Sequence, residues 1–203
     1  MKVLTKFLLS AFAPEHFPPP GLPEIAFLGR SNVGKSSLIN SLVSAKIAKT
    51  SNTPGRTQAI NFFEIRWPGR PRPELVFADL PGYGYARVPR AITRTWPEFI
   101  DPYLAERPTL SLCLCLVDAN IPPQPSDTQM IQYLRQNNRP LLVVATKSDR
   151  VGNRLQASLS ALKRAHGVDC VLPYSAKTGL GQDELWKRLR ASSTQASATG
   201  ESA

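Results

Sequence analysis

Eight consecutive residues near the start of the chain read Gly29-Arg30-Ser31-Asn32-Val33-Gly34-Lys35-Ser36. Their spacing follows the pattern G-x-x-x-x-G-K-S, in which glycines let backbone N–H groups turn toward a bound phosphate. The apolar run before it, Glu24 to Leu28, predicts a buried strand, and apolar positions at helical spacing from Lys35 to Val43 predict a helix after it. Strand, loop and helix together predict a phosphate-binding loop, because the positive end of a helix favours an anion.

Apolar runs alternate with amphipathic segments along the rest of the chain. Six strands are expected, at 24–28, 59–67, 74–78, 110–117, 141–145 and 170–174. Pro68-Gly69 predicts a hairpin-like turn between the second and third of them. Further helices are expected around 130–134, 155–162 and 185–189. This alternation predicts an α/β domain with a mostly parallel six-stranded sheet and helices on both faces.

Length and composition set the limits of the interpretation. The 203 residues suit one domain, and 42% hydrophobic with 20% charged residues is typical of globular proteins. No stretch approaches the roughly 18 apolar residues of a spanning helix, so we expect no membrane span. The three cysteines form neither a disulfide framework nor a zinc pattern. We divide the chain into a lead segment (1–22), a nucleotide-binding domain (23–190) and a disordered tail (191–203).

Polar motifs follow three of the predicted strands. Asp79-Leu80-Pro81-Gly82 offers a carboxylate for a Mg²⁺-bound water and a glycine N–H for a γ-phosphate. The carboxylate of Thr146-Lys147-Ser148-Asp149 can accept hydrogen bonds from the N1–H and N2–H₂ groups of guanine, a donor pair that adenine lacks. Backbone N–H groups of Tyr174-Ser175-Ala176-Lys177 can meet guanine O6. Because parallel strands bring their carboxyl ends to one edge, we expect these motifs to form one nucleotide site.

The loop residues have separate expected roles. Lys35 supplies a charge for the β- and γ-phosphates, and the hydroxyl of Ser36 is a Mg²⁺ ligand. Tyr83 stands where Ras-type switches carry a water-orienting glutamine. A phenol cannot both donate and accept as a carboxamide does, so we expect slow intrinsic hydrolysis of GTP.

Three segments resemble the bacterial EngB (YihA/YsxC) family, a branch of the translation-factor-related P-loop GTPases. They are Gly29 to Asn40, Thr53-Pro54-Gly55-Arg56-Thr57-Gln58, and Asp79-Leu80-Pro81-Gly82-Tyr83-Gly84-Tyr85-Ala86. The resemblance covers about residues 20 to 190 and implies a P-loop GTPase fold that binds GTP or GDP with Mg²⁺. It also implies a cytoplasmic switch in assembly of the large ribosomal subunit, with the subunit precursor and its rRNA as partners, and a link to cell division through septation. We expect a monomer.

The resemblance also assigns residues. It implies that Thr57 coordinates Mg²⁺ beside Ser36 and, through a water, Asp79. Lys35, Thr57, Gly82 and Asn32 are the expected catalytic residues. The expected nucleotide contacts are residues 29–36 with Ser37, then Gly55, Arg56, Thr57, Gln58 and Ala59, and the three motifs 79–82, 146–149 and 174–177.

Two activating devices are compatible with the sequence. Asn32 resembles the loop asparagine that binds K⁺ in related GTPases, although an asparagine can equally cap the local turn. Arg56 is an alternative as an arginine finger supplied by the chain itself.

The net charge of +10 suggests a polyanionic partner. Seven of the arginines lie between residues 56 and 94, a stretch that includes both expected switch loops. These arginines can meet rRNA phosphates. These are Arg56, Arg66, Arg70, Arg72, Arg87, Arg90 and Arg94. The alternative is that they are merely solvated. A nucleotide-gated RNA-binding module with incidental hydrolysis also remains open, whereas the Asp149 motif argues against a metabolic kinase.

Overall fold

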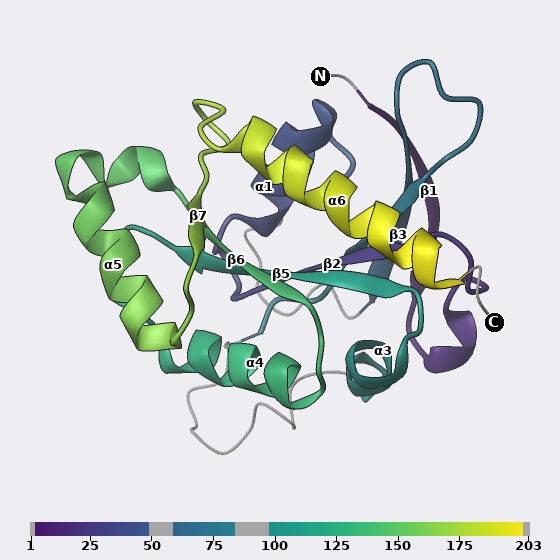
Figure 1. The fold of residues 1–203 in the computed structure, drawn as a ribbon, viewed down its shortest axis with the longest axis horizontal. Helices are drawn as coiled ribbons and strands as arrows, with labels where there is room; N and C mark the ends of the chain where they lie inside the picture. The colour runs from purple at the N-terminus through teal and green to yellow at the C-terminus, as the bar shows by residue number, and fades with distance from the viewer. Residues whose placement is uncertain (1–2, 49–58, 84–97, 201–203) are drawn as a thin grey trace.

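A seven-stranded sheet forms the middle layer of the computed structural model, which describes residues 3–48, 59–83 and 98–200 (Figure 1). Its strands are β1 (Leu4–Ala11), β2 (Glu24–Gly29), β3 (Ile60–Arg66), β4 (Leu75–Asp79), β5 (Leu110–Asp118), β6 (Leu141–Thr146) and β7 (Val171–Pro173). They lie in the order β1-β3-β4-β2-β5-β6-β7. β3 is antiparallel to both of its neighbours, and the pairs from β4 to β7 are parallel. The mostly parallel sheet is therefore confirmed, with one strand more than expected.

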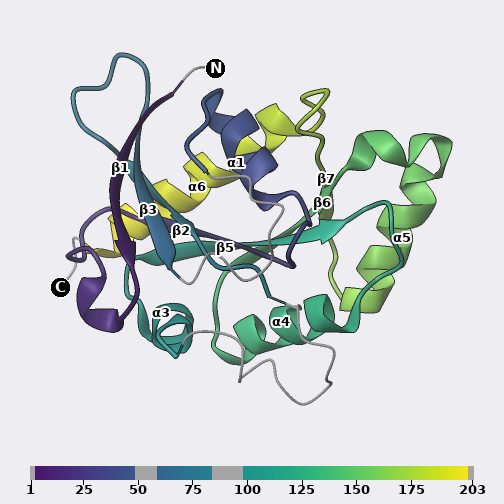
Figure 2. The same cartoon turned by 180° about the vertical axis from the view of Figure 1, so that it is seen from behind.

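Helices cover both faces of the sheet (Figures 1 and 2). They are α1 (Lys35–Val43), α3 (Ile100–Glu106), α4 (Pro125–Gln136), α5 (Leu155–His166) and α6 (Gln182–Gly200). α1 and α6 share one hydrophobic core, and α3, α4 and α5 share the other. All six residues of β2 are buried, because the strand is central and covered on both faces. This confirms the predicted α/β layering.

Within the lead segment expected over residues 1–22, the structure has a strand that the sequence analysis did not predict. Leu4–Ala11 form β1, which pairs with β3 along the edge of the sheet. The Phe7 ring packs edge-on against Phe63 at 5.6 Å between centroids, and the Ser10 hydroxyl donates to Asn61 Oδ1 at 2.6 Å. The sequence of β1 lacks the continuous apolar pattern of a buried strand, because Leu4 and Phe7 are about half exposed on this edge strand.

Two helices also differ from the expectation. α3, a seven-residue helix, was not predicted. α6 runs to Gly200, whereas a disordered tail was expected from residue 191. Adding residues to a helix already anchored on the sheet avoids the unfavourable nucleation step. Within the described residues, no helix is long and apolar enough to cross a membrane.

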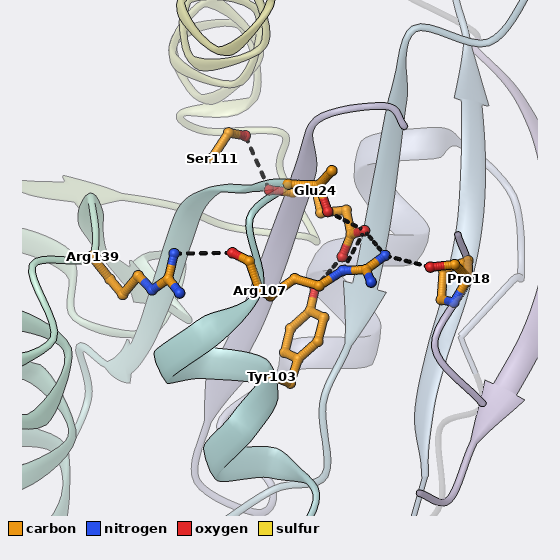
Figure 3. A network of polar contacts seen from close by, with 7 residues as sticks. Pro18, Glu24, Tyr103, Arg107, Ser111 and Arg139 are labelled. Carbon is orange, nitrogen blue, oxygen red and sulfur yellow. Dashed lines mark hydrogen bonds and ion pairs between the residues drawn. The ribbon is translucent and has the colours of Figure 1, made fainter. Parts of the chain in front are cut away.

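A buried polar cluster lies at the amino-terminal end of β2, opposite the phosphate loop (Figure 3). Arg107 Nε donates to Glu24 Oε1 at 2.9 Å, and the Tyr103 hydroxyl donates to Glu24 Oε2 at 2.8 Å. The same arginine donates to the carbonyl of Pro18 at 2.7 Å, and its own carbonyl accepts from Arg139 at 3.0 Å. The cluster therefore joins the segment before β2 to β2, to α3 and to the start of β6.

Candidate functional site

The phosphate loop connects the end of β2 to the start of α1. Val33 N donates to the carbonyl of Arg30 at 3.1 Å, which closes a tight turn. Gly34 has φ of +105°, a conformation that side chains other than glycine rarely adopt. Thr146 Oγ1, at the end of β6, donates to the carbonyl of Val33 at 2.6 Å. The expected loop is therefore present, directly before a helix N-terminus and held from the neighbouring motif.

Lys35 and Asp79 form a buried ion pair at this loop. The Lys35 ammonium, in the first turn of α1, contacts Asp79 Oδ1 at the end of β4. The two side chains are only 12% and 7% exposed. The carboxylate thus faces a cation at the place where the sequence predicts a Mg²⁺-bound water, and Ser36 adds a hydroxyl next along the helix. Carboxylate and hydroxyl oxygens are hard donors that suit Mg²⁺.

The segment after β4 is tied to the phosphate loop through its backbone. Tyr83 N donates to the carbonyl of Gly29 at 3.2 Å, and Ser31 N donates to the carbonyl of Tyr83 at 3.1 Å. Gly82 lies so close to the phosphate loop that a Cβ atom added to it would be 3.0 Å from Ser31 Oγ. The side chain of Tyr83 is buried, and its hydroxyl donates to Asp127 Oδ1 on α4 at 3.1 Å.

The motifs after β6 and β7 also meet. Ser175 Oγ donates to Asp149 Oδ1 at 2.6 Å, and this hydrogen bond lowers the pKa of Asp149 below its ordinary value. Lys147 Nζ donates to the carbonyl of Asn32 at 2.8 Å and to Asp118 Oδ2 at 2.6 Å. The exposed Asp149 carboxylate is therefore held by Ser175, and the lysine two residues earlier in the chain contacts the phosphate loop.

A shallow groove of about 520 Å³ runs between α1 and the segment after β7. Ser37 and Ser41 line it from α1, and Ala176 and Lys177 line it from the opposite side. Asn40 also lines the groove, and its Oδ1 accepts from the backbone N–H groups of Ile47 and Ala48 at 2.9 and 2.8 Å.

Most of the predicted site residues lie at the carboxyl ends of the parallel strands. The loop 29–37 and the motifs 79–82, 146–149 and 174–177 come together there, with Ala59 just before β3. Gly55, Arg56, Thr57 and Gln58 lie outside the described residues. Asn32 is exposed with φ of 65°.

Sequence reasoning missed two acidic residues at this edge. Asp118 closes β5 and pairs with Lys147, and its place directly after an apolar run could have revealed it. Asp127 is buried on α4, and its partner Tyr83 is 44 residues away in sequence. Nothing local in the sequence indicates that pairing.

The arginines are placed differently from the expectation. Arg66 ends β3, and Arg70 and Arg72 lie in the following connection to β4. Because Asn61 at the start of β3 pairs with Asp79, this connection lies at the end of the sheet away from the phosphate loop. Arg56, Arg87, Arg90 and Arg94 lie outside the described residues.

A phosphate loop after β2, an aspartate at the end of β4 and an Asp–Ser pair after β6 and β7, on this sheet, define a P-loop GTPase. A family model described as "50S ribosome-binding GTPase" matches residues 24–147. The chain is 61% identical over 201 residues to a "Probable GTP-binding protein EngB" of Koribacter versatilis, covering 98% of this chain and 99% of that one. It belongs to the EngB family of GTP-binding proteins.

Other comparisons agree with this assignment. A second "Probable GTP-binding protein EngB", from Acidobacterium capsulatum, is 59% identical and covers 97% of this chain and 95% of its own. A crystal structure of a probable GTP-binding protein engB matches with a TM-score of 0.65 and 26% identity, covering 85% of this chain and 99% of that one. Era, in complex with MgGDPNP and nucleotides 1506–1542 of 16S ribosomal RNA, matches with a TM-score of 0.65 and 26% identity, over 82% of this chain and 55% of Era.

Proposed function

We propose that this GTPase is a Mg²⁺-dependent switch that acts in the cytoplasm on the assembling large ribosomal subunit, with a link to septation. The observation that carries the nucleotide part is the shared edge, where Lys35 and Asp79 lie beside the phosphate loop and Asp149 pairs with Ser175. The residues gathered here can bind the phosphates, the metal ion and the base of a single nucleotide.

The residues divide between the phosphates and the metal. Lys35 binds the β- and γ-phosphates, and Gly82 senses the γ-phosphate through its backbone N–H. Ser36 and Thr57 hold Mg²⁺, and Asp79 holds it through a water. A Mg²⁺ ion held by these residues would supply positive charge to neutralise the phosphates. The buried Lys35–Asp79 contact supports this assignment, because it shows that this carboxylate already accepts a cation at the loop.

The base is read by the motifs after β6 and β7. Asp149 accepts from guanine N1–H and N2–H₂, and Ser175 holds that carboxylate in place. The lowered pKa of Asp149 keeps it ionised at neutral pH, as a double acceptor must be. Lys147 links the base loop to the phosphate loop through the carbonyl of Asn32.

Hydrolysis is slow without an activator in this proposal. The Tyr83 hydroxyl is engaged by Asp127 in the core, so it does not orient a water. Asn32 lies on the exposed surface of the phosphate loop, where a K⁺ ion bound beside the phosphates would act in place of an arginine finger. We expect faster turnover in KCl than in NaCl at equal ionic strength; equal rates would remove the K⁺ site.

The ribosomal part rests on the relatives and on charge. The matching family model is described as ribosome-binding, and the similar protein Era is bound to ribosomal RNA in its crystal structure. The chain carries a net charge of +10, which favours an RNA partner.

Nucleotide titration followed by sedimentation tests the proposal. We expect GTP and GDP to bind and ATP to bind far more weakly. With GTP the chain should sediment with large-subunit precursors, and with GDP it should be released. Single-turnover phosphate release should be faster with the precursors present. Binding without such stimulation would favour a nucleotide-gated RNA-binding module instead.

A further inference from the structure

Tyr83 is held at both its backbone and its side chain, directly after the glycine assigned to γ-phosphate sensing. We propose that the hydrogen bond between Tyr83 and Asp127, here called the Tyr83–Asp127 latch, positions Gly82 so that the site distinguishes GTP from GDP. The inference rests on the proposed function, because it takes Gly82 as the γ-phosphate sensor. Tyr83 and Asp127 are positioning residues in this scheme and touch no nucleotide.

The backbone supplies the first part of the argument. Tyr83 forms an isolated parallel bridge with Arg30, made by its hydrogen bonds to Gly29 and Ser31. The backbone hydrogen bonds of Tyr83 therefore hold the preceding residue, Gly82, close to Ser31. A displacement of Tyr83 would therefore also move the adjoining Gly82, which lies against Ser31.

The side chain supplies the second part. The Tyr83 side chain is 4% exposed and Asp127 is 3% exposed, so the hydrogen bond between them lies inside the core. Breaking it leaves a buried carboxylate with one hydrogen bond fewer, which is unfavourable. The bond therefore resists displacement of Tyr83 more strongly than an exposed contact would.

Arg30 adds a third element from the phosphate loop. Its charge acts on both Tyr83 and Asp127, and its Nε is buried without a hydrogen-bond partner among the described residues. The latch thus sits where the phosphate loop, the segment after β4 and α4 meet. Among the described residues, Asp118 and Cys115 of β5 are the other ionisable groups that act on this pair.

Preorganisation explains why the latch should act on GTP alone. A Gly82 N–H already fixed in place loses little freedom when it binds a γ-phosphate. If the latch is broken, the Gly82 N–H group is free to move, and the loss of this freedom on binding lowers the affinity for GTP. GDP has no γ-phosphate, so its affinity should not depend on where Gly82 lies.

The test uses Tyr83→Phe, which keeps the ring in the core and removes the hydroxyl. We expect the affinity for a non-hydrolysable GTP analogue to fall roughly three- to tenfold, the range of one net hydrogen bond, while GDP affinity stays within about twofold. Asp127→Ala should behave in the same way. Asp127→Asn should restore the wild-type ratio, because its Oδ1 still accepts from Tyr83.

Tyr133→Phe is the matched control. Tyr133 also lies on α4 and donates to an aspartate, Asp101, but far from the phosphate loop in the fold. Its removal should leave the ratio of GTP-analogue to GDP affinity unchanged. A ratio unaffected by Tyr83→Phe, or equal losses for both nucleotides, would overturn the latch. Failure of the wild-type chain to bind GTP would instead overturn the proposed function.

Discussion

Asp149 is the residue on which base selectivity should depend. Asp149→Asn replaces one acceptor oxygen by a donor, which then faces a donor of guanine. Because hydrogen bonds to charged groups are worth about 1.5–3 kcal/mol, we expect GTP affinity to fall by about 10- to 100-fold. Xanthosine triphosphate, which carries an acceptor where guanine has its amino group, should gain affinity. Competitive titration of the two nucleotides measures both changes.

Ser175→Ala is a useful companion to this variant. It removes the hydroxyl that holds Asp149 without changing the carboxylate. GTP affinity should fall less than in Asp149→Asn, and xanthosine triphosphate should not gain. Unchanged GTP affinity in Asp149→Asn would contradict the assignment of the base site.

Asp127 makes stability depend on pH. Burial raises the pKa of Asp127 from 3.8 to about 6, opposed by the hydrogen bond from Tyr83 and by Arg30. Asp118, which faces it from β5, raises that pKa further, and Cys115 lies close by. Between pH 4 and 6 the folded chain keeps a proton that the unfolded chain releases, so stability should fall as pH rises through this window.

The expected size of this effect is about 3 kcal/mol. Urea unfolding at a series of pH values, compared between the wild type and Asp127→Asn, isolates it. The variant cannot titrate at this position, so its advantage over the wild type should grow from pH 4 to pH 6 and then stay constant. Parallel curves for the two proteins would contradict the raised pKa.

At the scale of elements, α6 is anchored to the sheet mainly by Trp186. Its ring stacks on Phe77 at 5.9 Å and meets Trp67 edge-on at 4.9 Å. Trp186→Ala should lower the free energy of unfolding by about 3–5 kcal/mol, because it leaves a large cavity. Lys187→Ala, at a side chain 77% exposed, is the control and should change it by less than about 0.5 kcal/mol.

A second substitution separates ring packing from polarity. Trp186 Nε1 is buried without a hydrogen-bond partner among the described residues. Trp186→Phe therefore removes an unsatisfied donor together with part of the ring, and we expect a loss well below that of Trp186→Ala. Equal losses, measured by urea unfolding, would mean that the whole indole is needed to fill the space.

Elements differ in how far the sequence predicts them. β2, β5 and β6 are central, covered on both faces and hence continuously apolar, so their positions were predicted to within a residue or two. β1 lacks that pattern because one of its sides is open. α3 is only seven residues long and has too few turns to show a period.

The site divides in the same way. Its loops could be predicted because each follows a strand end, and parallel strands place those ends at one edge. The Tyr83–Asp127 pairing depends on how α4 packs beneath that edge, which no local pattern records. Of the seven arginines singled out, the structure describes Arg66, Arg70 and Arg72, and antiparallel β3 carries these three away from the nucleotide.

At the scale of the whole molecule, the nucleotide and the arginines of the β3–β4 connection lie at opposite ends of the sheet. Reversing Arg66 and Arg72 together to glutamate should weaken binding to large-subunit precursors without changing GTP affinity. If each arginine contacts a phosphate, the slope of log K against log salt should become less steep by about 0.7–0.9 per contact.

Lys163 and Arg164 provide a matched control for charge. Both are exposed on α5, which packs near β7 at the other edge of the sheet. Reversing them changes the net charge by the same amount. Equal effects of the two double variants on subunit binding would show that only net charge matters, and that Arg66 and Arg72 are simply solvated.

The buried cluster around Glu24 has a consequence for the order of events during synthesis. Glu24 belongs to the strand that leads into the phosphate loop, yet its partner Arg107 is 83 residues later in the chain. At a synthesis rate of about 5–20 residues per second, roughly 4 to 17 s separate the two residues. The phosphate loop is therefore synthesised well before Arg107. Until α3 and Arg107 have been made, β2 cannot be buried with the Glu24 carboxylate paired to its arginine.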